Sequence, residues 1–206
     1  MSPKLLFFAL LKIYLLIISK KILYTERQFE PEKLTVYSQY FYLRKYPQYA
    51  EKFAYDKKAL FNYFNTTGIS KGECASPAFD IQYYLEKNPQ LKKKFGNNYN
   101  LAYLYFLSKG KYETDEFSPI FNAKYYFDNN RDLFDSFHGD RDLAMDHFVR
   151  HGMWEGRLSN QNFNLQAYKW SNEDVRKKIG NNNFEYYMDY YFSGKKRGRK
   201  ATFDKK

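Results

Sequence analysis

Residues 79–91 read FDIQYYLEKNPQL, and residues 121–133 read FNAKYYFDNNRDL. The two stretches begin 42 residues apart and share a phenylalanine, a doubled tyrosine, an asparagine and a leucine at the same places. The same step leads back to Tyr37 and on to Phe163. A fixed period of this length is typical of proteins built from stacked structural repeats. We therefore divide the chain into units 1 to 4: residues 37–78, 79–120, 121–162 and 163–194.

Several columns keep this register across the units. Three are apolar in all four units, a fourth is apolar except at Lys169, and one column consists of glycine. Registered columns of this kind predict a core to which each unit contributes in the same way. The columns are Tyr49, Leu91, Leu133 and Val175; Phe53, Phe95, Phe137 and Ile179; Phe64, Phe106, Phe148 and Tyr190; Leu43, Leu85, Phe127 and Lys169; and Gly68, Gly110, Gly152 and Gly194.

Within a unit the residues indicate short helices. Asp80 is a candidate N-cap, and Asn88 precedes a second helix with Pro89 at its first position, where a missing N–H costs nothing. Asn98 or Asn100 precedes a third helix, which we expect to end at Gly110 in a left-handed conformation. The matching cap candidates in the other units are Asp56, Asp140 and Asn182.

No stretch alternates apolar and polar residues as a strand would. Each unit is too small to bury its own apolar face, so neighbouring units must stack. The sequence therefore predicts an all-α, solenoid-like tandem array over residues 37–194. An apolar N-terminal helix and linker (residues 1–36) precede this array, and a basic tail (residues 195–206) follows it.

The single cysteine, Cys74, excludes an intramolecular disulfide and fits a reducing compartment. The net charge of +11 is concentrated at the C-terminus, where residues 195–206 hold seven basic residues and one acidic one. Such a tail predicts contact with an anionic surface, and the alternative is a solvated end. No base-reading module accompanies it, so nucleic acid is not favoured as a partner. The candidate contact residues are Lys195, Lys196, Arg197, Arg199 and Lys200.

Residues 5–18, LLFFALLKIYLLII, are strongly apolar and flanked by lysines. They are shorter than the roughly 20 residues of a membrane span. Three interpretations remain open: an uncleaved membrane anchor, an amphipathic helix that caps the first unit, and an atypical signal peptide. We favour the anchor, and hence a membrane-associated or cell-surface location, with a cytoplasmic location as the alternative.

Candidate chemical groups coincide with repeat columns. His147 and His151 have the spacing of a helical metal-ligand pair, but the first shares its column with two tyrosines. Asp140-Arg141-Asp142 resembles the Asp-x-Asp pattern of glycosyltransferases, although helix capping by Asp140 already accounts for it. We find no phosphate-binding glycine loop and no nucleophile motif. The sequence therefore predicts neither an enzyme nor a cofactor.

The doubled aromatics suggest a surface role. Adjacent helical side chains point about 100° apart, so both members of a pair cannot face the core equally. We expect one tyrosine per unit to be partly exposed, forming a ladder that suits stacking on sugars or packing on a protein partner. The alternative is that both rings pack against adjoining units. The predicted ladder is Tyr42, Tyr84, Tyr126 and Tyr168.

The unit resembles a known tandem repeat with the pattern Phe-Asp-x-x-Tyr-Tyr-Leu-x-x-Asn-Pro-Asp-Leu, then Phe-Gly, His-Phe, Gly-x-x-Glu-Gly-Arg and Ser-Pro-x-Phe. The matches are FDIQYYLEKNPQL, Phe95-Gly96, His147-Phe148 with HGMWEGR after it, and the Ser-Pro pairs at residues 76 and 118. The fourth unit departs, with Ala167 in place of the first tyrosine and GKKRGRK in place of the Gly-x-x-Glu-Gly-Arg segment.

Similar repeats accompany bacterial secreted or cell-wall-associated proteins and glycosyltransferase domains. The resemblance implies surface or glycan biology and transfers no site residue. We therefore expect a non-catalytic interaction module that binds glycan or protein along the array. The alternative is an accessory part of a glycosyltransferase.

Overall fold

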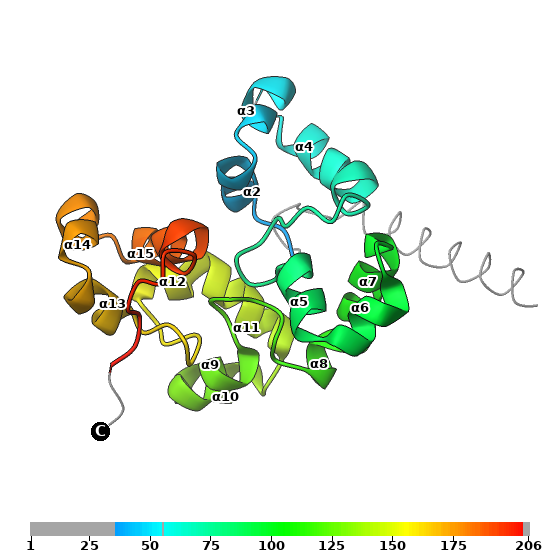
Figure 1. The fold of residues 1–206 in the computed structure, drawn as a ribbon. Helices are drawn as coiled ribbons and strands as arrows, with labels where there is room; N and C mark the ends of the chain where they lie inside the picture. Colours follow the sequence, from blue (N-terminus) through cyan, green and yellow to red (C-terminus); the bar gives the residue numbers. More distant parts are fainter. Residues whose placement is uncertain (1–35, 55, 204–206) are drawn as a thin grey trace, which may run out of the picture. The chain divides into compact units, whose positions relative to one another are not determined.

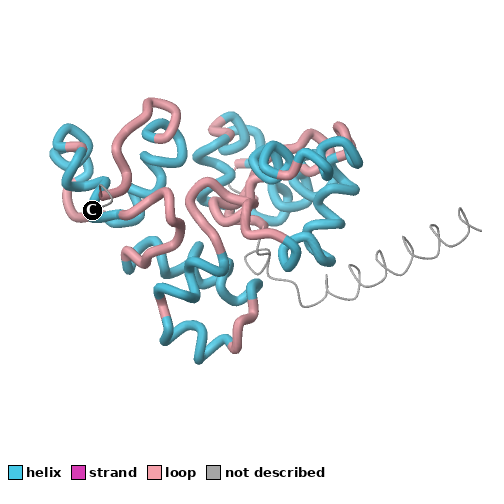
Figure 2. The backbone as a smooth tube through the Cα atoms, turned by 60° about the horizontal axis from the view of Figure 1, so that its bottom comes forward, coloured by secondary structure: helices cyan, strands magenta, loops and turns pink. Residues whose placement is uncertain are grey.

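The computed structural model describes residues 36–54 and 56–203 of the 206-residue chain. These residues form short helices joined by loops (Figure 1). Figure 2 shows no strand among them, and their only β-type contacts are isolated bridges. The prediction of an all-α chain is confirmed for this part. The apolar segment at residues 5–18 lies outside the described residues.

The helices recur with the period of the sequence. The first helix of each unit has seven residues and begins one full period after its predecessor. A second short helix follows it after a brief connection. The first helices are α2 (Gln39–Lys45), α5 (Ile81–Lys87), α9 (Ala123–Asn129) and α13 (Leu165–Ser171). The second helices are α3 (Gln48–Phe53), α6 (Pro89–Phe95), α10 (Arg131–Phe137) and α14 (Glu173–Ile179).

A third helix in each unit runs directly into a short π-helix, and in the second and third units a further turn follows. The third helices are α4 (Lys57–Tyr63), α7 (Tyr99–Tyr105), α11 (Arg141–His147) and α15 (Asn183–Asp189). The π-helices are η2 (Phe64–Gly68), η3 (Phe106–Gly110), η4 (Phe148–Gly152) and η5 (Tyr190–Gly194). The further turns are α8 (Lys111–Glu113) and α12 (Met153–Glu155).

The helix starts follow from side-chain capping. Asp80 accepts hydrogen bonds from the backbone N–H groups of Gln82 and Tyr83, and Asn98 accepts one from Leu101. These caps satisfy N–H groups that have no partner inside the helix. The predicted caps Asp56, Asp140 and Asn182 are confirmed in the same way.

Asn88 precedes α6 as predicted, with Pro89 at the first helical position, but its side chain makes no capping bond. Its amide instead donates to the carbonyls of Tyr84, at 2.8 Å, and Glu116, at 3.3 Å. Asn130 and Asn172 make the equivalent pair of bonds in the next two units. This asparagine therefore ties the end of the first helix to the last segment of its own unit.

The expectation that Gly110 ends its helix in a left-handed conformation is wrong. Gly110 has φ −57° and ψ −35°, and the chain continues helically into α8. The column contains glycine because a Cβ atom there would overlap the hydroxyl oxygen of the unit's buried tyrosine, which is Tyr84 for Gly110. The equivalent close approaches are Gly68 to Tyr42, Gly152 to Tyr126 and Gly194 to Tyr168.

The core of each unit is aromatic. The first residue of a unit packs against the first residue of its π-helix, with ring centroids 3.8 Å apart for Phe79 and Phe106 and 4.9 Å apart for Phe121 and Phe148. A backbone bond also closes each unit, from the residue before its first helix to a carbonyl in its last segment. These bonds are Ser38 to Ala75, Asp80 to Phe117, Asn122 to Ser159 and Asn164 to Ala201.

Helix α2, near the start of the described chain, contacts α15 and η5 near its end. The Phe41 ring lies 5.1 Å from Tyr191 and 5.4 Å from Phe192 between centroids. Arg44 forms an ion pair with Glu185 at 2.8 Å. A stack in which units touch only their sequence neighbours does not make such contacts. Units 1 and 4 are therefore also neighbours in space.

Candidate functional site

The predicted tyrosine ladder is not on the surface. Tyr42, Tyr84, Tyr126 and Tyr168 each have an exposed fraction of 0%. The expectation that they are partly exposed is wrong, because each ring fills the space between its own first helix and the glycine of its own π-helix. In units 2 and 3 the partly exposed ring is the other member of the pair, Tyr83 or Tyr125, so the alternative that both rings pack against adjoining units does not hold there.

The hydroxyl groups of these buried rings have different partners in each unit. Tyr42 donates to Glu73, Tyr168 donates to Asp189 at 2.6 Å, and Tyr126 shares a 2.8 Å hydrogen bond with Nδ1 of His147. The Tyr84 hydroxyl has no hydrogen-bond partner. The buried tyrosine ring is therefore common to all four units, whereas the partner of its hydroxyl differs, as expected for a structural position.

His147 and His151 lie together as their spacing predicts, with ring centroids 5.5 Å apart. Burial lowers the pKa of His147. Its Nδ1 atom is engaged by Tyr126, and its Nε2 atom lies 4.0 Å from a Glu155 oxygen. Within residues 36–54 and 56–203, no three His, Cys, Asp or Glu side chains are grouped so as to hold a metal ion.

The Asp140-Arg141-Asp142 segment takes part in helix capping and in packing between units. Asp140 caps α11, and Arg141 donates to the carbonyls of Lys111 and Thr114 of the preceding unit. Asp142 pairs with Lys111, whose side chain is only 8% exposed. The Asp-x-Asp resemblance is therefore accounted for by contacts between units 2 and 3.

The basic C-terminal segment is not simply a tail. Its described part, residues 195–203, completes the last unit: Arg199 forms an ion pair with Asp174 at 2.6 Å, and the Lys200 carbonyl accepts from Asn172 at 2.8 Å. Arg199 occupies the place that Arg157 has in the preceding unit, where that residue pairs with Asp132. Residues 195–203 are therefore bonded to the last predicted unit, and the boundary at residue 195 stays a prediction.

The other predicted anionic-surface residues differ from Arg199. Lys195 lies with its ammonium 4.4 Å from the centre of the Tyr83 ring, and burial lowers its pKa. Lys196, Arg197 and Lys200 are exposed. Nothing in the structure tests their contact with an anionic surface, which stays a prediction.

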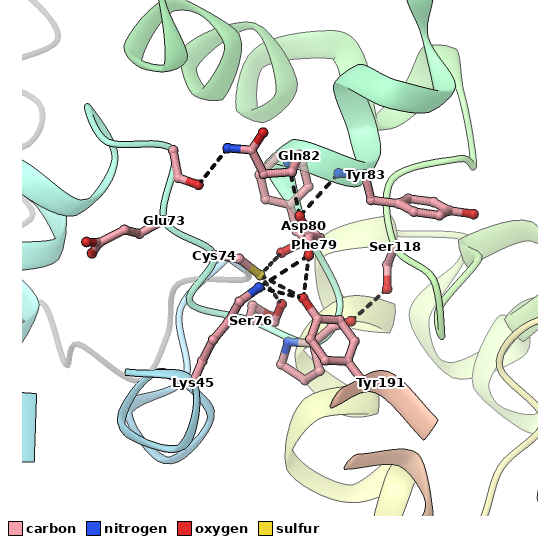
Figure 3. A network of polar contacts seen from close by, with 12 residues as sticks. Lys45, Glu73, Cys74, Ser76, Phe79, Asp80, Gln82, Tyr83, Ser118 and Tyr191 are labelled. Carbon is pink, nitrogen blue, oxygen red and sulfur yellow. Dashed lines mark hydrogen bonds and ion pairs between the residues drawn. The ribbon is translucent and has the colours of Figure 1, made fainter. Parts of the chain in front are cut away.

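A polar cluster of Lys45, Cys74, Asp80 and Tyr191 brings several reactive side chains together, with Cys74 and Asp80 buried and Lys45 and Tyr191 half-buried (Figure 3). The Lys45 ammonium lies 2.9 Å from the Tyr191 hydroxyl and 3.4 Å from an Asp80 oxygen. Tyr191 donates to Asp80, and the Cys74 sulfur lies 3.4 Å from the Tyr191 hydroxyl. The cluster joins α2, the start of α5 and η5.

The contacts of the polar cluster stabilise the charge of Asp80. Burial alone would raise the pKa of Asp80, but the Lys45 ammonium, the Tyr191 hydroxyl and two backbone N–H groups lower it below its ordinary value. Burial raises the pKa of the Cys74 thiol to about 12. A thiol that stays protonated at neutral pH is a poor nucleophile. The arrangement therefore acts as an internal ion pair that ties three units together.

A second group, which we call the aromatic shelf, consists of Tyr40, Trp154 and Phe184 and lies on the surface. The Trp154 ring stacks on Phe184 with centroids 4.6 Å apart and planes inclined by 14°. Tyr40 meets the same Phe184 edge-on at 5.3 Å. Phe184 is 5% exposed, whereas Trp154 and Tyr40 are 54% and 56% exposed. The shelf thus has a buried base and two exposed rings.

Polar groups border the aromatic shelf. Arg44 donates to both oxygens of Glu185 at 2.8 Å, and the Tyr40 hydroxyl lies 3.3 Å from one of them. Burial opposes the charge of Arg44, but the Glu185 carboxylate raises its pKa above the ordinary value. The Asn183 amide donates to the Trp154 carbonyl at 3.0 Å. The ion pair of Arg44 and Glu185 therefore lies beside Tyr40, and a hydrogen bond from Asn183 fixes the backbone of Trp154.

Sequence reasoning missed the aromatic shelf, although a signal was present. The column of Phe184 holds Lys58, Asn100 and Asp142 in the other units, so a phenylalanine is the exception among polar residues. The column of Tyr40 is likewise polar elsewhere. Departures from the repeat, and not its shared positions, mark this surface.

No protein-family model matches the sequence, and no curated protein or solved structure is significantly similar to it. The resemblance to accessory repeats of cell-wall-associated proteins therefore stays a prediction. Across residues 36–54 and 56–203, none of the helices has both the length and the apolar character that crossing a membrane requires.

Proposed function

We propose that this protein is a non-catalytic binding module, built as four tandem helical units, that attaches to glycans through exposed aromatic side chains. The observation that carries the proposal is the exposure of large rings on a framework that buries most of its aromatic side chains. Tyr40 on α2 and Trp154 on the turn α12 are 56% and 54% exposed. Rings with an apolar face and a polar edge suit ligands that have both apolar and hydrated surfaces.

The side chains that could perform chemistry support a non-catalytic role, because they are engaged in structural bonds. Asp80 caps a helix and pairs with Lys45, and His147 is bonded to Tyr126. Cys74 is buried with a raised pKa. None of these groups combines exposure with an activating neighbour, which catalytic acids, bases and nucleophiles need.

The sequence repeat supports the four-unit organisation, with the last unit extended to include residues 195–203. Attachment to a membrane through residues 5–18 belongs to the same proposal. The aromatic exposure favours glycan as the partner over the protein alternative.

Sedimentation with insoluble polysaccharide tests the proposal. The full chain is mixed with cellulose, chitin and bacterial peptidoglycan, and the bound fraction is measured after centrifugation. We expect retention on at least one polymer, reduced by competition with its soluble fragments, and no release of free sugar from sugar nucleotides added in parallel. No retention on any polymer would overturn the glycan proposal, and sugar-nucleotide turnover would overturn its non-catalytic part.

A further inference from the structure

We infer that the aromatic shelf is a binding subsite for one uncharged pyranose ring of a polysaccharide, held against the outer face of Trp154. This inference rests on the proposed function and assigns its site. The inner face of the Trp154 ring is taken up by Phe184 at 4.6 Å, so a ligand can stack only on the other face. A pyranose with equatorial hydroxyls presents a flat C–H surface that matches such a face.

The shelf is rigid before a ligand arrives. Phe184 is 5% exposed and is contacted by Tyr40 from one side and Trp154 from another. Asn183 holds the backbone of Trp154, and its own side-chain oxygen accepts from Lys169 at 2.7 Å. Binding to a surface that is already ordered loses little conformational entropy.

The border of the shelf supplies hydrogen-bonding groups for sugar hydroxyls. Glu185 and Arg44 have side chains 29% and 32% exposed, so each can reach a ligand while it keeps its partner. Hydrogen bonds that involve a charged donor or acceptor are stronger than neutral ones. The charges of this pair cancel, which favours an uncharged sugar over an acidic one.

The size of the shelf favours a sugar over a protein. Two rings that are about half exposed offer roughly 250 Å² of surface, because a whole aromatic side chain has about 150–250 Å². A stable protein interface buries about 800 Å² on each partner. A single pyranose ring, in contrast, is about as large as one indole face.

The shelf also depends on the contact between units 1 and 4. Tyr40 comes from α2, Trp154 from α12 and Phe184 from α15. The equivalent turn in unit 2 carries the exposed Tyr112, but the residue in place of Phe184 there is Asp142. Tyr112 therefore has no such stacked base and provides a matched comparison.

Tryptophan fluorescence tests the inference directly, since the chain has only two tryptophans, Trp154 and the 77% exposed Trp170. In a Trp170→Phe variant of the full chain, emission reports on Trp154 alone. We titrate it with the hexasaccharides of β-1,4-linked glucose, N-acetylglucosamine, xylose and mannose. We expect a saturable change in emission with at least one of them.

Titration calorimetry with the active hexasaccharide then measures the affinity of each variant and so the contribution of each residue to binding. We expect Trp154→Ala to weaken binding about tenfold or more, since it removes the stacking surface. Glu185→Gln should weaken it severalfold, and Tyr112→Ala should leave it within about twofold. Far-UV circular dichroism of each variant controls for folding, and Trp154→Phe, which keeps an aromatic face, should retain most of the affinity.

The shelf assignment can fail while the proposed function stands. If the full chain is retained on a polysaccharide but no hexasaccharide alters Trp154 emission, or Trp154→Ala binds as tightly as the parent, the shelf assignment is overturned and the proposed function stands. If neither retention nor an emission change occurs, both are overturned.

Discussion

The contact between Gly110 and Tyr84 predicts that a substitution at Tyr84 restores the stability lost through a substitution at Gly110. A Cβ atom at residue 110 would overlap the Tyr84 hydroxyl oxygen and would lie 3.3 Å from the ring carbon that carries it. Tyr84 has an exposed fraction of 0%, so its ring cannot swing aside. Overpacking of this kind costs about 1–3 kcal/mol. Helix propensity favours alanine by about 1 kcal/mol, because Gly110 already has helical φ and ψ.

Gly110→Ala should therefore lower the free energy of unfolding by up to about 2 kcal/mol. Tyr84→Phe should be neutral or stabilising, since it removes a buried hydroxyl that has no partner. In the double variant the overlap disappears, and the helix propensity gain remains. We expect the double variant to be at least as stable as the parent, with a coupling energy of about 2 kcal/mol between the two sites.

Urea unfolding followed by far-UV circular dichroism measures the free energy of unfolding of the parent, the two single variants and the double variant. The matched control is the Gly152→Ala and Tyr126→Phe pair, where the overlap is the same but the hydroxyl is bonded to His147. Loss of that bond costs about 1 kcal/mol and offsets the helix-propensity gain of the alanine, so the control double variant should be about as stable as the parent. If the effects of Gly110→Ala and Tyr84→Phe are additive, with no coupling energy between them, the steric explanation of the glycine column is wrong.

Three further predictions follow from single features. Burial lowers the pKa of His147 below its ordinary value of about 6.5, so the unfolded chain binds this proton more tightly than the folded protein does, and the free energy of unfolding should fall as the pH drops from 7 to 5. His147→Tyr should flatten that dependence in urea titrations at both pH values, and an unchanged slope would contradict it. Arg199→Ala should cost up to about 1 kcal/mol, because its ion pair is partly exposed, whereas the exposed Lys196→Ala should stay within about 0.5 kcal/mol. For residues 5–18, we expect the full chain in the carbonate-resistant membrane fraction and a chain starting at Phe29 in the soluble fraction, and a soluble, stable full chain would refute the anchor.

The helix boundaries could be predicted because they depend on local chemistry. Asp80 and Asn98 cap helices through bonds to residues two or three positions away, which a sequence shows directly. The regular period carries the same chemistry to the other units. All-α structure and the cap positions were therefore within reach of sequence reasoning.

The roles of Gly110 and Tyr84 could not be read in the same way. Their contact joins opposite parts of one unit, and either residue alone has a more common explanation: a helix end for the glycine and a surface ring for the tyrosine. The sequence shows both columns but not that they touch. The burial of Tyr84 depends on this contact, so the binding ladder was placed on the wrong residues.

The contact between α2 and η5 depends on residues that the repeat does not share. Tyr191 bonds Asp80, and Lys45 lies over its ring, whereas the residues in its place in the other units are Asn65, Leu107 and Val149. Because these partners occur in single units, the repeat pattern does not show them, and the sequence predicts contacts between sequence neighbours alone.

The pairing of Lys45 with Asp80 and Tyr191 has a consequence for how such a gene can lengthen. Repeat proteins commonly grow by internal duplication, since a copied unit finds the same neighbour on each side. Here a fifth copy inserted before residue 163 would compete with the last unit for the α2 surface, and a copy added after residue 203 would lack the lysine and aspartate that unit 4 meets. Lys45 and Asp80 therefore select the segment that carries Tyr191 for contact with α2.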